Sequence, residues 1–155
     1  MEVMELIKQA EGKVTENQEI RDMSKNCPNM KGGRQGDLYV IRCDSDDDIK
    51  ELEDKFRCST NDMWSDFTFG TEFEKRDTNQ LADGSSKGSR HIFSGNGDVL
   101  FSKNGHPCAG GKIITNKGWT LTHPEHAHFK FPAGQFVFFF QLDVRKEREV
   151  QRVRD

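Results

Sequence analysis

Apolar and polar residues alternate along several short segments of this chain, which is the pattern of half-buried β-strands. The longest apolar run, Phe136–Leu142, is apolar at both odd and even positions. A strand of this kind is expected to be covered on both faces, so we expect this run to be central in a sheet. Further strands are expected at residues 36–42, 63–73, 91–93, 98–102, 113–114, 119–122 and 129–131.

Turn residues separate these segments. The dipeptide Asn96-Gly97 lies between two short apolar segments, 91–93 and 98–102, and predicts a β-hairpin. The segment Asn104–Lys112 contains three glycines and a proline and is expected to be a loop.

One helix is expected near residues 45–57. Either Asp44 or Ser45 can cap its start, and the acidic residues that follow favour the positive end of a helix. Ile49, Leu52 and Phe56 then form an apolar stripe at helical spacing.

These elements predict an all-β domain, a mainly antiparallel sandwich or barrel of jelly-roll or cupin-like type. We divide the chain into a polar N-terminal arm at residues 1–33, a β domain at 34–143 and a charged C-terminal tail at 144–155. The tail is dense in Arg and Glu and is expected to be a short solvated helix.

The composition narrows the class of function. Hydrophobic residues make up 33% of the chain and the mean hydropathy is −0.83, so we expect a modest core or a core completed by other subunits. A net charge of −3 argues against nucleic acid or an anionic membrane as partner. No run of about 18 apolar residues is present. The four cysteines form no C-x-x-C pair, which favours free thiols in a reducing compartment.

Histidines are concentrated in one segment, His123-Pro124-Glu125-His126-Ala127-His128. In an extended chain, His126 and His128 point the same way, and two imidazoles on one strand are suited to a divalent ion such as zinc or iron. His123 or Glu125 can complete a set of nitrogen and oxygen ligands, and two other histidines, His91 and His106, are candidate ligands from loops. The alternative is a polar loop whose histidines hydrogen-bond to the backbone. No catalytic nucleophile stands out.

Several motifs resemble those of a family of small, functionally uncharacterised proteins from bacteria and tailed phages. Its pattern contains R-Q-G-D, L-A-x-G-E-x-T-G-H-x-H, L-x-H-x-E-H-A, P-x-G-x-Y, Q-R-E-Y and a closing R-V-A-D. The matching residues are Arg34-Gln35-Gly36-Asp37, Leu81-Ala82-Asp83-Gly84, Gly88, His91, Leu121, His123, Glu125, His126, Ala127, Pro132, Gly134, Gln141, Arg152, Val153 and Asp155. Ser85, Lys87 and Ser89 stand where that pattern has Glu, Thr and its first His, so part of the family's polar site is missing here.

The resemblance implies a phage structural protein, either a capsid decoration or cement protein or another virion assembly subunit. Such a protein would act through contacts with capsid or other virion proteins and with its own copies. It would need no cofactor and would be found in the virion after assembly in the host cytoplasm. The alternative is a cupin-like protein or metalloenzyme that holds one zinc- or iron-type ion through His123, Glu125, His126, His128 and His91. A third possibility is a phage factor directed at a host component.

Overall fold

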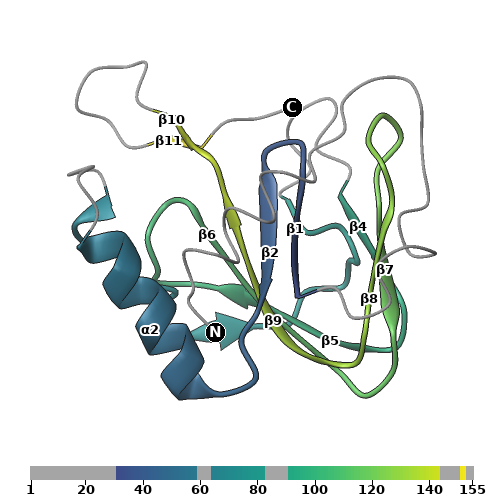
Figure 1. Ribbon diagram of the computed structural model, residues 1–155, viewed down its shortest axis with the longest axis horizontal. Coiled ribbons are helices and arrows are strands. Elements are labelled where there is room, and N and C mark those ends of the chain that lie inside the picture. Colours follow the sequence, from purple (N-terminus) through teal and green to yellow (C-terminus); the bar gives the residue numbers. More distant parts are fainter. Residues whose placement is uncertain (1–30, 59–63, 83–90, 144–150, 153–155) are drawn as a thin grey trace.

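The computed structural model describes residues 31–58, 64–82, 91–143 and 151–152 (Figure 1). The larger of its two main sheets has six strands, each antiparallel to its neighbours. In spatial order they are β1 (Gly32–Gln35), β2 (Leu38–Arg42), β9 (Gly134–Phe140), β6 (Ala109–Thr115), β5 (Gly97–Ser102) and β3 (Phe73–Glu74).

The second sheet has three antiparallel strands. They are β4 (Ile92–Ser94), β7 (Trp119–Thr122) and β8 (Phe129–Phe131). A short pair, β10 (Leu142–Asp143) and β11 (Gln151–Arg152), follows β9. The helix α2 (Asp46–Arg57) and the three-stranded sheet lie on opposite sides of the six-stranded sheet (Figure 1). The expected all-β sandwich with one short helix is therefore confirmed.

Two apolar cores cover the two faces of the six-stranded sheet. The inner core lies between the two sheets and takes Phe136, Phe138 and Phe140 from β9. The outer core lies beneath α2 and takes Val137 and Phe139 from the same strand. All five side chains are almost completely buried, and β9 has a paired neighbour on each side. This confirms the prediction of a central strand with both faces covered.

The helix forms where its capping residues predicted it. The hydroxyl of Ser45 accepts a hydrogen bond from the backbone N–H of Asp48 at 3.2 Å, and three aspartates occupy the first turn. Leu52 and Phe56 on one side of α2 are buried in the outer core. No helix in the described part of the chain is long and apolar enough to span a membrane.

The hairpin predicted around Asn96 is wrong. β4 pairs with β7 and β5 pairs with β6, so the chain passes from one sheet to the other at this turn. A Cβ atom at Gly95 would lie 2.8 Å from the Cβ of Trp119, so the backbone passes very close to β7 as it leaves the three-stranded sheet. Gly95 therefore allows the backbone to approach Trp119 more closely than a residue with a side chain could.

Two further predictions need correction. Residues 63–73 were expected to form one strand, but only Phe73–Glu74 does so among those described. Phe67 and Phe69 alternate because both are buried in the outer core from an irregular segment. The expected loop at 104–112 is also partly wrong, because β6 begins at Ala109. A side chain at Gly110 would overlap the ring of Phe138, so this glycine is required by packing inside a strand.

The ends of the domain differ slightly from the predicted boundaries. β1 begins at Gly32, inside the predicted arm of residues 1–33, and residues 1–30 lie outside the described part. The helix predicted for the tail is contradicted at Gln151–Arg152, which pairs with β10 as a strand. Residues 144–150 and 153–155 are outside the described part.

Candidate functional site: a buried histidine cluster

The motif Arg34-Gln35-Gly36-Asp37 forms the turn between β1 and β2. Gln35 pairs with Leu38, which leaves a two-residue connection, and Gly36 has a φ of 58° that favours glycine. The carboxylate of Asp37 is 3% exposed, and the side chain of Gln35 is also buried. The turn therefore brings an amide and a carboxylate into the interior of the sandwich.

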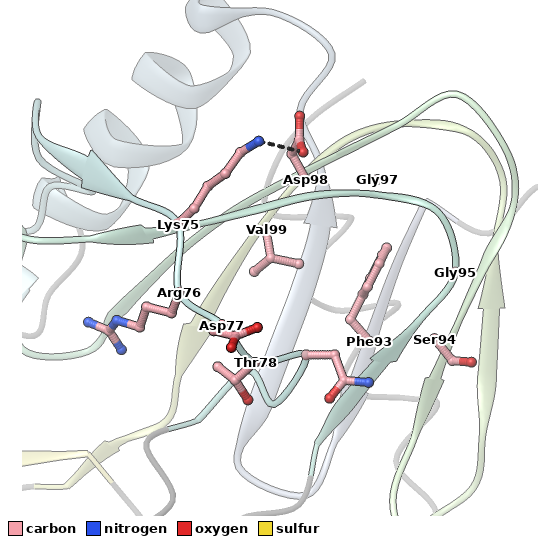
Figure 2. A pocket seen from close by; sticks show the side chains of 11 residues that line it. Lys75, Arg76, Asp77, Thr78, Phe93, Ser94, Gly95, Gly97, Asp98 and Val99 are labelled. Atoms are coloured by element: carbon pink, nitrogen blue, oxygen red, sulfur yellow. Dashed lines mark ion pairs between the residues drawn. The ribbon is translucent and has the colours of Figure 1, made fainter.

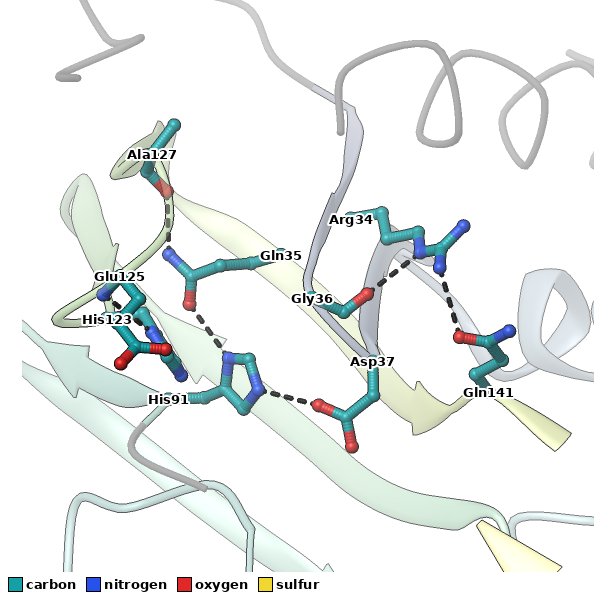
Figure 3. A network of polar contacts seen from close by, with 9 residues as sticks. All are labelled: Arg34, Gln35, Gly36, Asp37, His91, His123, Glu125, Ala127 and Gln141. Atoms are coloured by element: carbon teal, nitrogen blue, oxygen red, sulfur yellow. Dashed lines mark hydrogen bonds and ion pairs between the residues drawn. The ribbon is translucent and has the colours of Figure 1, made fainter. Parts of the chain in front are cut away.

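Both groups meet the ring of His91, which is completely buried (Figure 3). Its Nδ1 lies 2.9 Å from Oε1 of Gln35, and its Nε2 lies 2.8 Å from Oδ1 of Asp37. The amide nitrogen of Gln35 donates to the carbonyl oxygens of Leu121 at 3.2 Å and Ala127 at 2.8 Å. These two bonds fix the amide so that its oxygen faces His91.

The two oxygens that face His91 bear on its protonation. An amide oxygen and an ionised carboxylate oxygen only accept hydrogen bonds, so with Asp37 ionised both ring nitrogens of His91 donate. We therefore infer that His91 is an imidazolium ion paired with the carboxylate of Asp37. Because the side chains of His91 and Asp37 are only 0% and 3% exposed, each charge depends on the other for its stability.

Two more imidazoles adjoin this pair. The ring centroid of His123 lies 4.6 Å from that of His91 and 4.3 Å from that of His126. The rings of His91 and His126 are parallel, with centroids 6.4 Å apart. The Nδ1 of His123 accepts a hydrogen bond from the backbone N–H of Glu125 at 3.0 Å, so neutral His123 carries its proton on Nε2.

The structure gathers some of the predicted site residues and separates others. His91 and His123 are buried, and His126 is half-buried beside them. The side chain of His128 contacts the backbone, with Nε2 donating to the carbonyl oxygen of His123 at 3.2 Å, and Glu125 is exposed.

His106 lies in a different part of the molecule. Its Nδ1 accepts the backbone N–H of Cys108 at 3.0 Å, and its ring lies 5.6 Å from that of Trp64 and 5.2 Å from that of Phe67. It packs against the outer core and is not part of the histidine cluster. As a candidate metal ligand it stands apart from the other four histidines.

Metal binding requires an imidazole nitrogen with an available lone pair. In the arrangement described, both nitrogens of His91 donate, and the lone pair of His123 receives the N–H of Glu125. Within residues 31–58, 64–82 and 91–143, no group of three or more His, Cys, Asp and Glu side chains is placed to hold a metal ion. A metal at this position would have to displace some of these hydrogen bonds, and metal binding stays a prediction.

Gln35 and Asp37 are the members of the cluster that the metal hypothesis did not include. They lie 56 and 54 residues from His91 in the sequence, and spacing alone does not connect them. The only sequence feature that singled out Gln35 and Asp37 was their position in the R-Q-G-D motif. The first residue of this motif also has a partner, because Arg34 donates to the carbonyl of Gly36 at 2.8 Å and to Oε1 of Gln141 at 3.0 Å.

A separate cavity of about 610 Å³ opens beside the crossover from β4 to β5 (Figure 2). Phe93 and Val99 supply its apolar part, and an ion pair of 2.9 Å between Lys75 and Asp98 lies along it. The other lining residues are Arg76, Asp77, Thr78, Asn79, Ser94, Gly95 and Gly97. None of the predicted site residues lines this cavity.

Comparison with known proteins gives one match. A family model described as a domain of unknown function, DUF8820, matches residues 34–141. No curated protein and no solved structure matches the chain. The matched region begins at Arg34 and ends at Gln141, the two residues whose side chains are hydrogen-bonded across the domain. Since the match covers most of the chain, this protein belongs to the DUF8820 family.

Proposed function

We propose that this protein is a structural subunit of a phage particle, a capsid decoration or cement protein or another virion assembly subunit. It would act through contacts with capsid or other virion proteins and with its own copies, and would be assembled in the host cytoplasm. The resemblance of its R-Q-G-D and H-x-E-H-A segments to a phage and bacterial family supports the setting. The low mean hydropathy of −0.83 supports a fold that works together with partners.

The burial of the histidine cluster supports a function that does not involve catalysis. The histidine cluster is the strongest candidate for chemistry, yet His91, His123 and Asp37 are each at most 2% exposed. Its central hydrogen bonds join the β1–β2 turn to the three-stranded sheet. A catalytic group must reach its substrate, whereas this arrangement holds two sheets together. We therefore expect the function to depend on contacts made by the surface of the molecule.

Native mass spectrometry of the full chain and of a variant lacking residues 1–30 tests the assembly role. The deletion stops before Gly32 because β1 begins there, so the sheet is retained. We expect a metal-free closed oligomer for the full chain and weaker association for the deletion, with similar melting temperatures. Equal association of the two proteins would contradict a role for the arm.

The virion role has its own test. Peptides of this chain are expected in purified particles of the phage that encodes it, at a constant ratio to the capsid protein. If the chain is expressed in infected cells but does not purify with particles, the virion role is wrong. The same experiment separates a particle subunit from a phage factor that stays with a host component.

The second candidate function, binding of one zinc- or iron-type ion, has one observation in its favour. Three imidazole rings, those of His91, His123 and His126, converge within 6.4 Å. Elemental analysis of the native protein and of a His126→Ala, His128→Ala variant tests it. One metal per chain that disappears in the variant would establish the site, whereas a metal-free native protein of full stability would exclude it.

A further inference from the structure

The cavity beside the β4–β5 crossover is produced by the path of the chain between the two sheets. Residues 75–78 leave the pairing with β5 after Glu74 and reach the three-stranded sheet at Asn79, whose carbonyl accepts the N–H of Phe93 at 2.8 Å. Residues 95–96 pass between the same two sheets, from β4 to β5. The cavity of about 610 Å³ opens between these two crossovers (Figure 2). Small-molecule sites have volumes of about 300–1,000 Å³, so this cavity is large enough for a ligand.

The two cationic side chains among the described lining residues already pair with carboxylates. The ammonium group of Lys75 lies 2.9 Å from Oδ1 of Asp98. The Nε of Arg76 donates to Oε1 of Glu74 at 3.0 Å, and its guanidinium lies 4.4 Å from the ring centre of Phe101. A phosphate or carboxylate ligand would therefore have to compete with a carboxylate of the protein for either cation. These pairs favour a ligand without charge.

The other polar groups at the cavity suit a ligand that is rich in hydroxyls. Asp77, Asn79 and Ser94 line the cavity and are exposed, so a ligand can reach them. The carboxylate accepts hydrogen bonds, whereas the amide and the hydroxyl both accept and donate. An alcohol hydroxyl also accepts and donates, so it can bond to each of the three. An anionic ligand would instead be repelled by the carboxylate of Asp77.

Phe93 and Val99 supply an apolar surface that is fixed by the inner core. The ring of Phe93 lies 5.2 Å from that of Trp119, and Val99 packs against the buried residues of the same core. Figure 2 shows Asp77, Phe93 and Val99 around one space. A sugar ring carries C–H groups on its faces and hydroxyls on its rim, so it can contact the apolar surface and the polar groups together. A preformed surface of this mixed kind is typical of small-molecule sites.

We propose that this cavity binds a neutral saccharide unit, a hexose or an N-acetylhexosamine of a glycan chain. The inference goes beyond the proposed assembly function and does not depend on it, because the cavity belongs to a single chain. Binding of one unit through exposed groups is weak, with an expected dissociation constant of about 1 mM. Several copies that bind one glycan chain together would bind it more tightly.

Saturation-transfer difference NMR of the full chain tests the class of ligand. The neutral probes are the methyl glycosides of glucose, galactose, mannose, N-acetylglucosamine and N-acetylgalactosamine, and the anionic probe is the methyl glycoside of glucuronic acid. We expect saturable transfer to at least one neutral probe and a larger dissociation constant for the anionic probe. The proposal is wrong if no neutral probe gives a saturable signal, or if the anionic probe binds as tightly as the best neutral one.

Two substitutions test the position of the site. Asp77→Ala and Asn79→Ala each remove one hydrogen-bonding side chain from the cavity, and each should raise the dissociation constant of the best neutral probe about fivefold. The matched controls are Asp66→Ala and Asn116→Ala, which remove an exposed carboxylate and an exposed amide elsewhere on the chain. The controls should bind like the native protein, and melting temperatures check that all four variants are folded. If the cavity variants bind as tightly as the controls, this cavity is not the site.

A third substitution tests why the ligand is neutral. Asp98→Ala leaves the ammonium group of Lys75 without its carboxylate partner at 2.9 Å. The dissociation constant of the glucuronic acid probe, divided by that of the best neutral probe, should then fall about threefold, a modest change because both side chains of the pair are more than half exposed. An unchanged ratio would overturn the argument for a neutral ligand. Loss of the saccharide site by any of these results leaves the assembly role standing, because that role is tested by the oligomer and the particle.

Discussion

Removal of the carboxylate of Asp37 tests the central claim about the histidine cluster. In Asp37→Ala, the imidazole of His91 would remain buried with no counterion at 2.8 Å from its Nε2. Loss of one partner from a buried ion pair costs about 3–5 kcal/mol of folding free energy. Typical domains are stable by only about 5–15 kcal/mol, so the variant should lose a large share of its stability.

The reverse change gives a similar loss. His91→Ala leaves the carboxylate of Asp37 and the amide oxygen of Gln35 without the donors that they face. We expect a cost of about 3–5 kcal/mol for the carboxylate, with up to about 2 kcal/mol more for the amide oxygen. In the double variant neither charge remains, so its cost should fall short of the sum of the two single costs by about 2 kcal/mol or more.

Urea unfolding followed by tryptophan fluorescence measures these values, because Trp119 is 1% exposed in the inner core. The matched control is Asp66→Ala, which removes an 82% exposed carboxylate 3.7 Å from Nε2 of His106. Because the carboxylate of Asp66 is exposed to solvent, its contact with His106 should contribute less than about 1 kcal/mol. If Asp37→Ala costs no more than Asp66→Ala, or if the costs of Asp37→Ala and His91→Ala simply add, the inferred ion pair is wrong.

Two further predictions concern buried groups. Burial, together with nearby carboxylates, raises the pKa of the Cys43 thiol to about 12, so iodoacetamide at pH 8 should alkylate the exposed Cys58 and leave Cys43 unmodified in a peptide map. The protonated thiol of Cys43 stabilises the folded state below pH 9, and this contribution to stability is lost as the pH rises from about 9 to about 12. The free energy of unfolding of the native protein should therefore fall over that range. A Cys43→Ala variant, which lacks the thiol, should not show this part of the fall. Gly110→Ala should cost about 1–3 kcal/mol because its Cβ would lie 2.9 Å from the carbonyl oxygen of Phe138, whereas Gly118→Ala, whose only near contact is at 3.2 Å, should melt close to the native protein.

Local patterns predicted the elements whose signal is complete within a few residues. The run containing Phe136–Phe140 is apolar at both even and odd positions. The side chains at even positions are buried in the inner core, and those at odd positions are buried in the outer core. The helix near 45–57 combines a capping serine with an apolar stripe, and both signals lie within twelve residues. In each case the physical cause and the sequence signal occupy the same short segment.

The sequence could not predict features that depend on distant parts of the chain. The turn signal at Asn96-Gly97 is real, but it does not specify whether its flanking strands pair with each other or enter different sheets. Phe67 and Phe69 alternate like a strand because burial from an irregular loop gives the same pattern as burial from a sheet. The contact between Gln35 and His91 joins residues 56 positions apart, and no local periodicity carries that information.

The R-Q-G-D motif now has a structural explanation for each of its four residues. Arg34 ties the turn to Gln141 at the end of the domain, and Gln35 joins two carbonyls of the three-stranded sheet to His91. The glycine supplies the positive φ of the turn, and Asp37 supplies the counterion of the buried imidazolium. Each of these contacts holds parts of the fold together, so a structural role accounts for all four residues of the motif.

The hydrogen bonds that hold His91 come from residues outside the segment where this chain departs from the resembled pattern. His91 corresponds to the second histidine of the family's G-H-x-H pattern, and its two partners lie in the β1–β2 turn. The residues that depart from the pattern, Ser85, Lys87 and Ser89, lie outside the described part, and the hydrogen bonds of His91 to Gln35 and Asp37 do not involve them. Chemistry that required those positions could therefore be lost without breaking the ion pair that joins the sheets.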